Sequence, residues 1–186
     1  MTWQPDRKQV QEEAVGALRN ALAVGQEFSE ALRGCWYRDT AFATALLVVS
    51  LGQRFGPGSD IRLITAFVAR IRAARGGPTG AFPSREAEAL IRGYLGEVAM
   101  LDHVDPAKFS YAELGIAILG RLLEEWQPSP EEVGDLFART NAVRREMAEG
   151  FPQIAQAEDD WFASGMPDSP FATFSGEPPR RTDEEQ

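Results

Sequence analysis

The sequence predicts an all-α fold, a compact orthogonal or mixed bundle of about six helices with a C-terminal arm. Twelve prolines divide the 186-residue chain into segments of helical length, because proline lacks an amide proton and breaks helix interiors. Within each segment apolar residues recur at three- and four-residue spacing, which is the period of one helix face. No segment shows the sustained alternation and β-branched enrichment of a strand, so we predict no strands.

The first two predicted helices account for the N-terminal third of the chain. The first runs from about residue 6 to residue 32 and ends at the Gly-Cys pair 34–35. Asp39 or Thr40 caps the second helix, which continues to Leu51. The second helix is apolar on all sides, so we expect other helices to surround it.

The next two helices flank a glycine-rich loop. Ser59 or Asp60 caps the third helix, whose apolar stripe continues to Ile71. The loop at residues 76–80 lacks the Gly-Lys-Ser or Gly-Lys-Thr ending of a phosphate-binding loop, so it is interpreted as a connection between antiparallel helices. The fourth helix spans residues 83–101 and has the clearest amphipathic pattern in the chain.

Cap residues predict where the last two helices of the bundle begin. The fifth helix covers residues 110–126, and a serine at its first position caps it. Ser129 and Glu132 have the spacing of a capping box, in which each side chain accepts a hydrogen bond from the other residue's amide. Pro130 suits the first helical position, so a sixth helix is predicted to begin there.

The last part of the chain is predicted to be an arm. We expect a single helical domain over residues 1–164, including a short seventh helix at 153–163, and a proline-containing acidic tail over 165–186. The candidate partner-binding residues of this arm are four spaced aromatics, which suit a groove on this bundle or on a partner: Trp161, Phe162, Phe171 and Phe174.

Charge and composition narrow the classes of function. The net charge of −9 is uneven, with +4 over residues 54–92 and −12 over residues 93–186. An acidic protein repels nucleic acid overall, so we predict no nucleic-acid binding. The most apolar stretch, residues 41–51, is too short for a bilayer, so we predict no membrane span. One cysteine and the lack of an apolar run in residues 1–8 favour a cytoplasmic protein.

The chain's only histidine and only cysteine are the candidates for catalysis or metal binding. His103 lies between Asp102 and Asp105, but no second histidine stands at ligand spacing, so we predict no metal site. Cys35 would become a nucleophile only if a base approached it, and otherwise it is a small buried hydrophobe. We therefore predict no catalytic residues, no cofactor and no enzymatic activity.

Two other features are candidate binding surfaces. Arginines of the basic middle segment predict a surface for an anion or an acidic partner, with an ordinary solvated face as the alternative: Arg62, Arg70, Arg72, Arg75 and Arg85. Small residues inside the fourth and fifth helices indicate either close packing or a crevice for a ligand: Gly93, Gly96, Gly115, Ala117 and Gly120. Because residues 151–186 hold eight acidic and two basic residues, we also expect the arm to dock near the third helix.

The function predicted from these features is that of a non-enzymatic, cytoplasmic interaction or regulatory protein. It would bind a protein partner, or a second copy of itself, through its helical surface and its aromatic acidic arm. The alternative is a small-molecule-binding domain whose pocket lies among the phenylalanines, tryptophans and glycines of the bundle core.

Overall fold

A computed structural model of the chain confirms the all-α fold. The structure describes residues 6–56, 58–75, 82–105 and 110–150, and no strand occurs in these ranges. The predicted seventh helix, the glycine-rich loop and the aromatic arm lie outside them. The described helices are, in order, α1 (Arg7–Val24), α2 (Ser29–Arg38), α3 (Thr40–Arg54), α4 (Ile61–Ala74), α5 (Ser84–Tyr94), the 3-10 helix η2 (Val98–His103), α6 (Tyr111–Trp126) and α7 (Pro130–Gly150).

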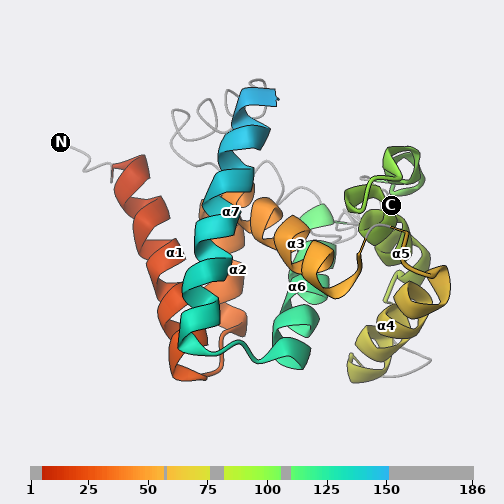
Figure 1. Cartoon of the computed structure of the whole chain (residues 1–186), viewed down its shortest axis with the longest axis horizontal. Coiled ribbons are helices and arrows are strands. Elements are labelled where there is room, and N and C mark those ends of the chain that lie inside the picture. Colours follow the sequence, from red (N-terminus) through yellow and green to blue (C-terminus); the bar gives the residue numbers. More distant parts are fainter. Residues whose placement is uncertain (1–5, 57, 76–81, 106–109, 151–186) are drawn as a thin grey trace, which may run out of the picture.

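Helix α3 is the centre of the fold, as its apolar sequence predicts. It contacts α2, α5, α6 and α7, and α6 joins it to α4. Figure 1 shows α1, α2 and α7 on one side of this centre and α4 and α5 on the other. The side chains of Phe42, Leu46 and Leu51 are completely buried. Phe42 packs on Phe137 of α7, with ring centroids 5.3 Å apart.

The single helix predicted over residues 6–32 is two helices. Gly25 adopts a left-handed conformation with φ of 66° and ends α1, and its amide donates to the Ala21 and Leu22 carbonyls. The carboxylate of Glu27 then accepts a hydrogen bond from the Ser29 amide at the start of α2. The predicted end at residues 34–35 is also wrong, because α2 continues to Arg38. The sequence did not reveal this break, because apolar residues recur at the same helical spacing before and after Gly25.

The predicted fourth helix is also shorter than its apolar pattern. Helix α5 ends at Tyr94, and Gly96 adopts a φ of 111° that an L side chain rarely accepts. The chain then forms η2, which packs back on α5. Leu101 on η2 covers Gly93, where an added Cβ atom would lie 2.3 Å from the leucine Cδ2 atom. The apolar residues after the turn therefore contact α5 from η2 and do not extend its face.

The predicted caps are present at the helix starts. The Asp39 carboxylate accepts from the Phe42 amide at 3.0 Å, and that of Asp60 accepts from the Arg62 amide at 2.9 Å. At α7 the Ser129 amide donates to Glu132 at 2.7 Å, and the Glu132 amide donates to the serine hydroxyl at 3.3 Å. Each cap satisfies an amide that has no partner inside its helix.

Gly115 decides how closely α2 and α6 pack. An added Cβ atom at this glycine would lie 2.1 Å from the Cη2 atom of Trp36, which is buried. The two helices are also joined at their exposed edge, where Glu113 accepts hydrogen bonds from Arg33 and from the Tyr37 hydroxyl, each at 2.8 Å. Close packing of an indole, and not a crevice, explains the glycine at this position.

None of the helices in the described ranges combines the length and the apolar character needed to cross a bilayer.

Candidate functional site

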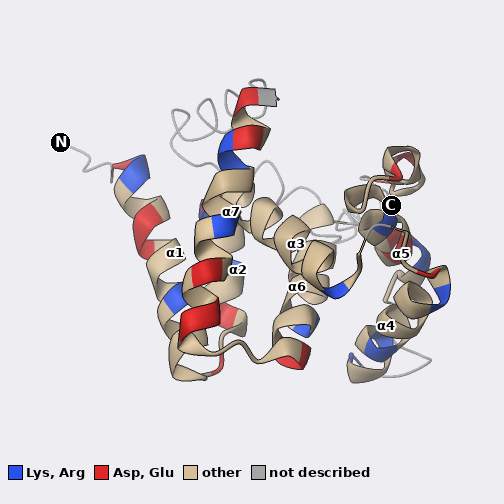
Figure 2. Ribbon diagram, in the orientation of Figure 1, with Lys and Arg blue, Asp and Glu red and all other residues tan. Residues whose placement is uncertain are grey.

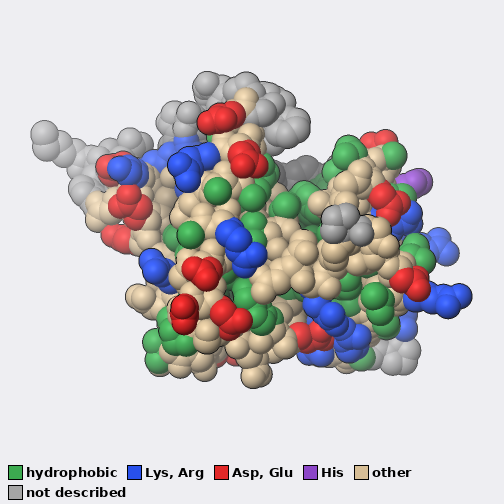
Figure 3. All heavy atoms as spheres, in the orientation of Figure 1, with side chains coloured by type: hydrophobic (Ala, Val, Ile, Leu, Met, Phe, Trp, Pro, Cys, Tyr) green, Lys and Arg blue, Asp and Glu red, His purple; other side chains and the backbone are tan. Residues whose placement is uncertain are grey.

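Four of the five predicted arginines are exposed and have no carboxylate partner in the described part of the chain. Arg62 and Arg72 on α4 and Arg85 on α5 form no ion pair with any described residue. Arg75 is also exposed, and its guanidinium lies 5.9 Å from the ring centroid of Phe82. Figure 3 shows basic side chains gathered at the α4 and α5 end of the molecule. None of these four arginines has a carboxylate partner among the described residues.

Arg70 has a different role from the other four. Its Nε and Nη2 atoms donate to the two carboxylate oxygens of Glu125 on α6, at 2.7 and 3.1 Å. Arg121 also donates to that carboxylate at 2.9 Å, and Arg54 of α3 lies 3.8 Å from it. The paired arginines, Arg70 first, lower the pKa of Glu125. Arg70 thus connects α4 to α6, and we leave it out of the binding surface.

The outer side of α4 combines these charges with exposed apolar groups. Ile61 is 47% exposed and Leu63 is 58% exposed, although both are large aliphatic residues. Helix α4 contains no acidic residue (Figure 2). We call this surface the α4 face. Ile61 and Leu63 lie at its two edges, about 200° apart around the helix axis. It is defined by six exposed residues: Ile61, Arg62, Leu63, Ala66, Ala69 and Arg72.

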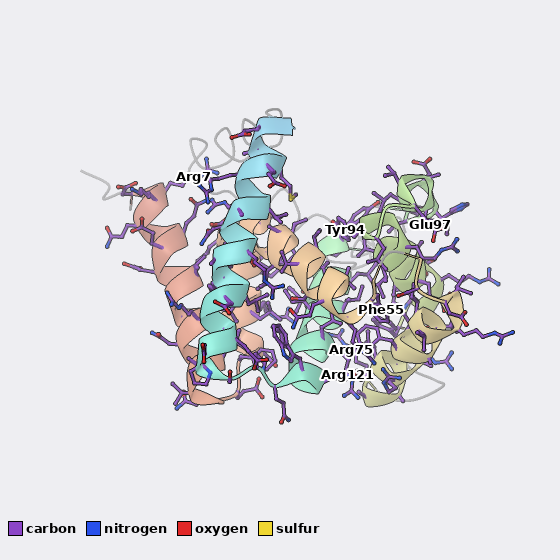
Figure 4. The ribbon with its side chains drawn as sticks, viewed as in Figure 1. Arg7, Phe55, Arg75, Tyr94, Glu97 and Arg121 are labelled. Atoms are coloured by element: carbon purple, nitrogen blue, oxygen red, sulfur yellow. The ribbon has the colours of Figure 1, made fainter. Side chains whose placement is uncertain are left out.

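A shallow groove lies on another side of α4, between this helix, α2 and α6. Its volume is about 450 Å³, and Arg75 and Arg121 both line it (Figure 4). Ala117 and Gly120, two of the small residues predicted to border a crevice, line the same groove. The small residues singled out in the sequence therefore divide into packing positions (Gly93 and Gly115), groove positions (Ala117 and Gly120) and one turn position (Gly96).

A larger cleft lies between α1 and α7, and Asp39 and Phe42 at the start of α3 also line it. Its volume is about 710 Å³. We call it the α1–α7 cleft; its lining residues are Lys8, Gln11, Glu12, Val15, Gly16, Arg19, Asp39, Phe42, Gly134, Phe137, Ala138, Asn141 and Arg144. The sequence did not indicate this cleft, because α1 and α7, which form its two walls, are far apart in the chain and come together only in the fold. The one local signal was a glycine inside each helix.

A buried carboxylate lies beneath this cleft. The side chain of Asp39 is 0% exposed, and the Nη2 atom of Arg144 lies 3.1 Å from its Oδ2 atom without the alignment of a hydrogen bond. Burial raises the pKa of Asp39, while Arg144, the Phe42 amide and Arg7 act in the opposite direction. Arg7 lies at the start of α1, on the side toward α7 (Figure 4). Asp39 therefore caps α3 and holds Arg144 in the wall of the cleft.

Cys35 and His103 lie in unlike surroundings. Cys35 is completely buried in α2, whereas His103 is exposed at the end of η2. Burial raises the pKa of the thiol to about 12; Asp39 adds to this effect and Arg144 opposes it. Arg33, which the sequence places near the thiol, pairs instead with Glu113. Within the described ranges, no three His, Cys, Asp or Glu side chains form a group able to hold a metal ion.

The raised pKa of Cys35 predicts an unreactive thiol. In the folded protein at pH 8, alkylation by iodoacetamide is expected to be at least about 100-fold slower than in the urea-unfolded chain, because the thiolate is the nucleophile. Mass spectrometry of the alkylated protein over time measures both rates. Similar rates in the two states would contradict the burial of this thiol.

Comparison of the chain with protein-family models, with curated proteins and with solved structures found no match. The fold and its surfaces define a helical-bundle protein with a basic, partly apolar α4 face and a polar cleft between α1 and α7. Its function has to be inferred from these residues.

Proposed function

We propose that this protein is a non-enzymatic, cytoplasmic interaction module that binds an acidic segment of a protein partner through the α4 face. The observation that carries the proposal is the coincidence of unpaired arginines and exposed aliphatic side chains on one helix. Elsewhere in the described chain, Arg33, Arg92 and Arg121 pair with carboxylates of the same molecule. Arg19 and Arg38 are each the only exposed arginine of their helix without an ion pair to a described residue. A surface that leaves both its charges and its large apolar groups in water is suited to a partner.

The spacing of the two arginines favours a helical partner segment. Arg62 and Arg72 are ten residues apart, so their Cα atoms lie about 15 Å apart along the helix. Ala66 and Ala69 lie between them and allow another helix to approach the backbone closely. A partner helix with acidic residues at matching spacing and an apolar strip between them would fit both features. The arginines would set the register and the association rate, and the aliphatic side chains would supply buried area.

Charge reversal on the α4 face tests this function. The double substitution Arg62→Glu/Arg72→Glu is expected to weaken binding of the partner by about 100-fold, because two favourable contacts become repulsive. The partner is first captured from a lysate of the source cells with the full-length protein, and its affinity for each variant is then measured by calorimetry at low and physiological salt.

The matched control is Arg38→Glu/Arg145→Glu, which makes the same change in net charge at exposed positions on α2 and α7. This control should bind the partner as the unmodified protein does. Capture of the same proteins by all three forms, with equal affinity, would show that the α4 face is not the binding surface.

A further inference from the structure

The geometry points to a binding site for a small organic anion, a carboxylate or a phosphate ester with an apolar body, in the α1–α7 cleft. This inference is independent of the α4 face, which lies on the other side of the bundle (Figure 1). The volume of about 710 Å³ lies within the range of pockets that hold small molecules.

Two glycines keep the cleft open. Gly16 lies inside α1 and Gly134 inside α7, and neither has the positive φ that would require glycine. No atom lies within 4 Å of an added Cβ at Gly16, and only the Arg19 guanidinium reaches that limit at Gly134. A glycine inside a helix costs about 1 kcal/mol relative to alanine. At Gly115 this cost is offset because the missing side chain leaves room for the Trp36 indole. At Gly16 and Gly134 no apolar side chain packs against the glycine, and the space is part of the cleft.

The charged groups of the cleft have an excess of donors. Each of the two carboxylates in the cleft already has a cationic partner. The Glu12 Oε1 atom lies 3.8 Å from Nζ of Lys8, and the Asp39 Oδ2 atom lies 3.1 Å from Nη2 of Arg144. Arg19 forms no ion pair with a described residue. The one positive charge in excess is that of Arg19, which lies eight residues from Gln11 on α1 and so about 12 Å from it along the helix.

Two amide side chains complete the polar end of the cleft. The Nε2 atom of Gln11 is buried and donates to no acceptor among the described residues. A buried donor without an acceptor is costly, and an anionic oxygen would satisfy it. Asn141 and Arg144 line the cleft from α7, one helical turn apart, as Gln11 and Lys8 do from α1. The unsatisfied Gln11 donor therefore assigns an acceptor oxygen of the anion to this end, and the excess charge of Arg19 acts on the anion from the other end of the cleft.

The floor and the middle of the cleft suit the apolar body of the ligand. The rings of Phe42 and Phe137 form the floor and are almost completely buried. Val15 and Ala138 line the walls beside the open space at Gly16. Lys8 and Arg19 are eleven residues apart on α1, so the cleft extends for about 16 Å along this helix. An aromatic ring or a short alkyl chain attached to the anion would contact Val15 and Ala138, which keep exposed surface above the buried rings.

Calorimetric titration of the full-length protein with four probes tests the ligand class. Phenyl phosphate and 3-phenylpropanoate are expected to bind saturably at one site, and the tighter of the two identifies the preferred anion. Inorganic phosphate alone and 3-phenylpropylamine are expected to bind at least about tenfold more weakly, because one lacks the apolar body and the other carries the wrong charge. No saturable binding of either aryl anion, or equal binding of the amine or of inorganic phosphate, would overturn the assignment.

Two variants with matched controls locate the site. Gly16→Leu fills the middle of the cleft, and Asn141→Asp places a negative charge at its anion end. Each is expected to raise the dissociation constant of the bound aryl anion at least about tenfold. Gly52→Leu and Asn20→Asp make the same changes at exposed helical positions outside the cleft and should leave the constant unchanged. Unchanged affinity in both cleft variants would place the anion elsewhere and overturn the proposal.

Discussion

Replacing Asp39 with alanine is expected to lower the free energy of unfolding by about 2–3 kcal/mol. Part of this loss is the N-cap of α3, because the Phe42 amide would lose its acceptor. The remainder arises because Arg144, whose side chain is only 32% exposed, would keep its charge without the carboxylate 3.1 Å away. Removing one partner of a buried ion pair lowers stability more than replacing both partners with apolar residues, because the remaining charge stays desolvated and unpaired.

Asp60→Ala is the matched control for this substitution. Asp60 also caps its helix with a side-chain carboxylate, which accepts from the Arg62 amide two residues on, but it is exposed and has no ion pair with a described residue. Its loss should therefore cost about 1 kcal/mol, the value of a cap alone. Urea unfolding followed by circular dichroism measures both variants. If Asp39→Ala cost no more than Asp60→Ala, the pairing with Arg144 would contribute nothing to stability.

The pH dependence of Asp39→Asn separates the charge from the cap, because asparagine caps helices as well as aspartate does. Burial raises the pKa of Asp39 in the folded state, so the folded protein retains this proton to a higher pH than the unfolded chain. The stabilisation from this group is complete below the ordinary carboxyl pKa and is lost as the pH rises through the raised value. The cost of Asp39→Asn should accordingly be largest at acidic pH and decrease toward neutral pH.

Gly115→Ala is expected to destabilise the fold by about 2–4 kcal/mol, although alanine is the better helix former. The new methyl group would lie 2.1 Å from Cη2 and 2.4 Å from Cζ2 of Trp36, so either the indole or the whole of α2 must shift. Gly52→Ala is the control. It lies on the exposed side of α3 with no atom within 4 Å of an added Cβ, and it should gain up to about 1 kcal/mol.

A double-mutant cycle with Trp36→Phe shows whether the loss comes from this contact. The smaller ring should recover part of the stability of Gly115→Ala, so the two changes together should cost less than their sum. Unfolding in urea, followed by far-UV circular dichroism, gives the four free energies. Strict additivity would mean that the added methyl group is accommodated without displacing Trp36.

Much of the local structure was predictable from the sequence. The Ser129 capping box and the start of α7 at Pro130 depend on residues within three positions of each other. The burial of α3 followed from its apolar surface alone. The break at Gly25 was missed because the apolar period continues across it, and a period does not report a change in helix direction. The turn at Gly96 was missed for the same reason.

The candidate sites were less predictable than the helices. Arg62 and Arg72 are exposed, which either a binding surface or an ordinary solvated face requires, whereas Arg70 is occupied by Glu125, 55 residues away in the sequence. Nothing near Arg70 in the sequence distinguishes it from its neighbours. The α1–α7 cleft was not predicted at all, because no spacing rule relates Gln11 to Asn141.

The all-α class, the helix starts at their caps, the central position of α3 and the basic character of α4 all follow from the amino-acid sequence alone. These properties depend on interactions within one or two helical turns, where residue spacing and backbone geometry are directly related. Only the tertiary structure decided which arginines are paired, why Gly115 cannot be larger, and that Asp39 lies beneath an open cleft beside Arg144. Those properties depend on the packing of helices distant in sequence, since burial and ion pairing arise only when such helices meet.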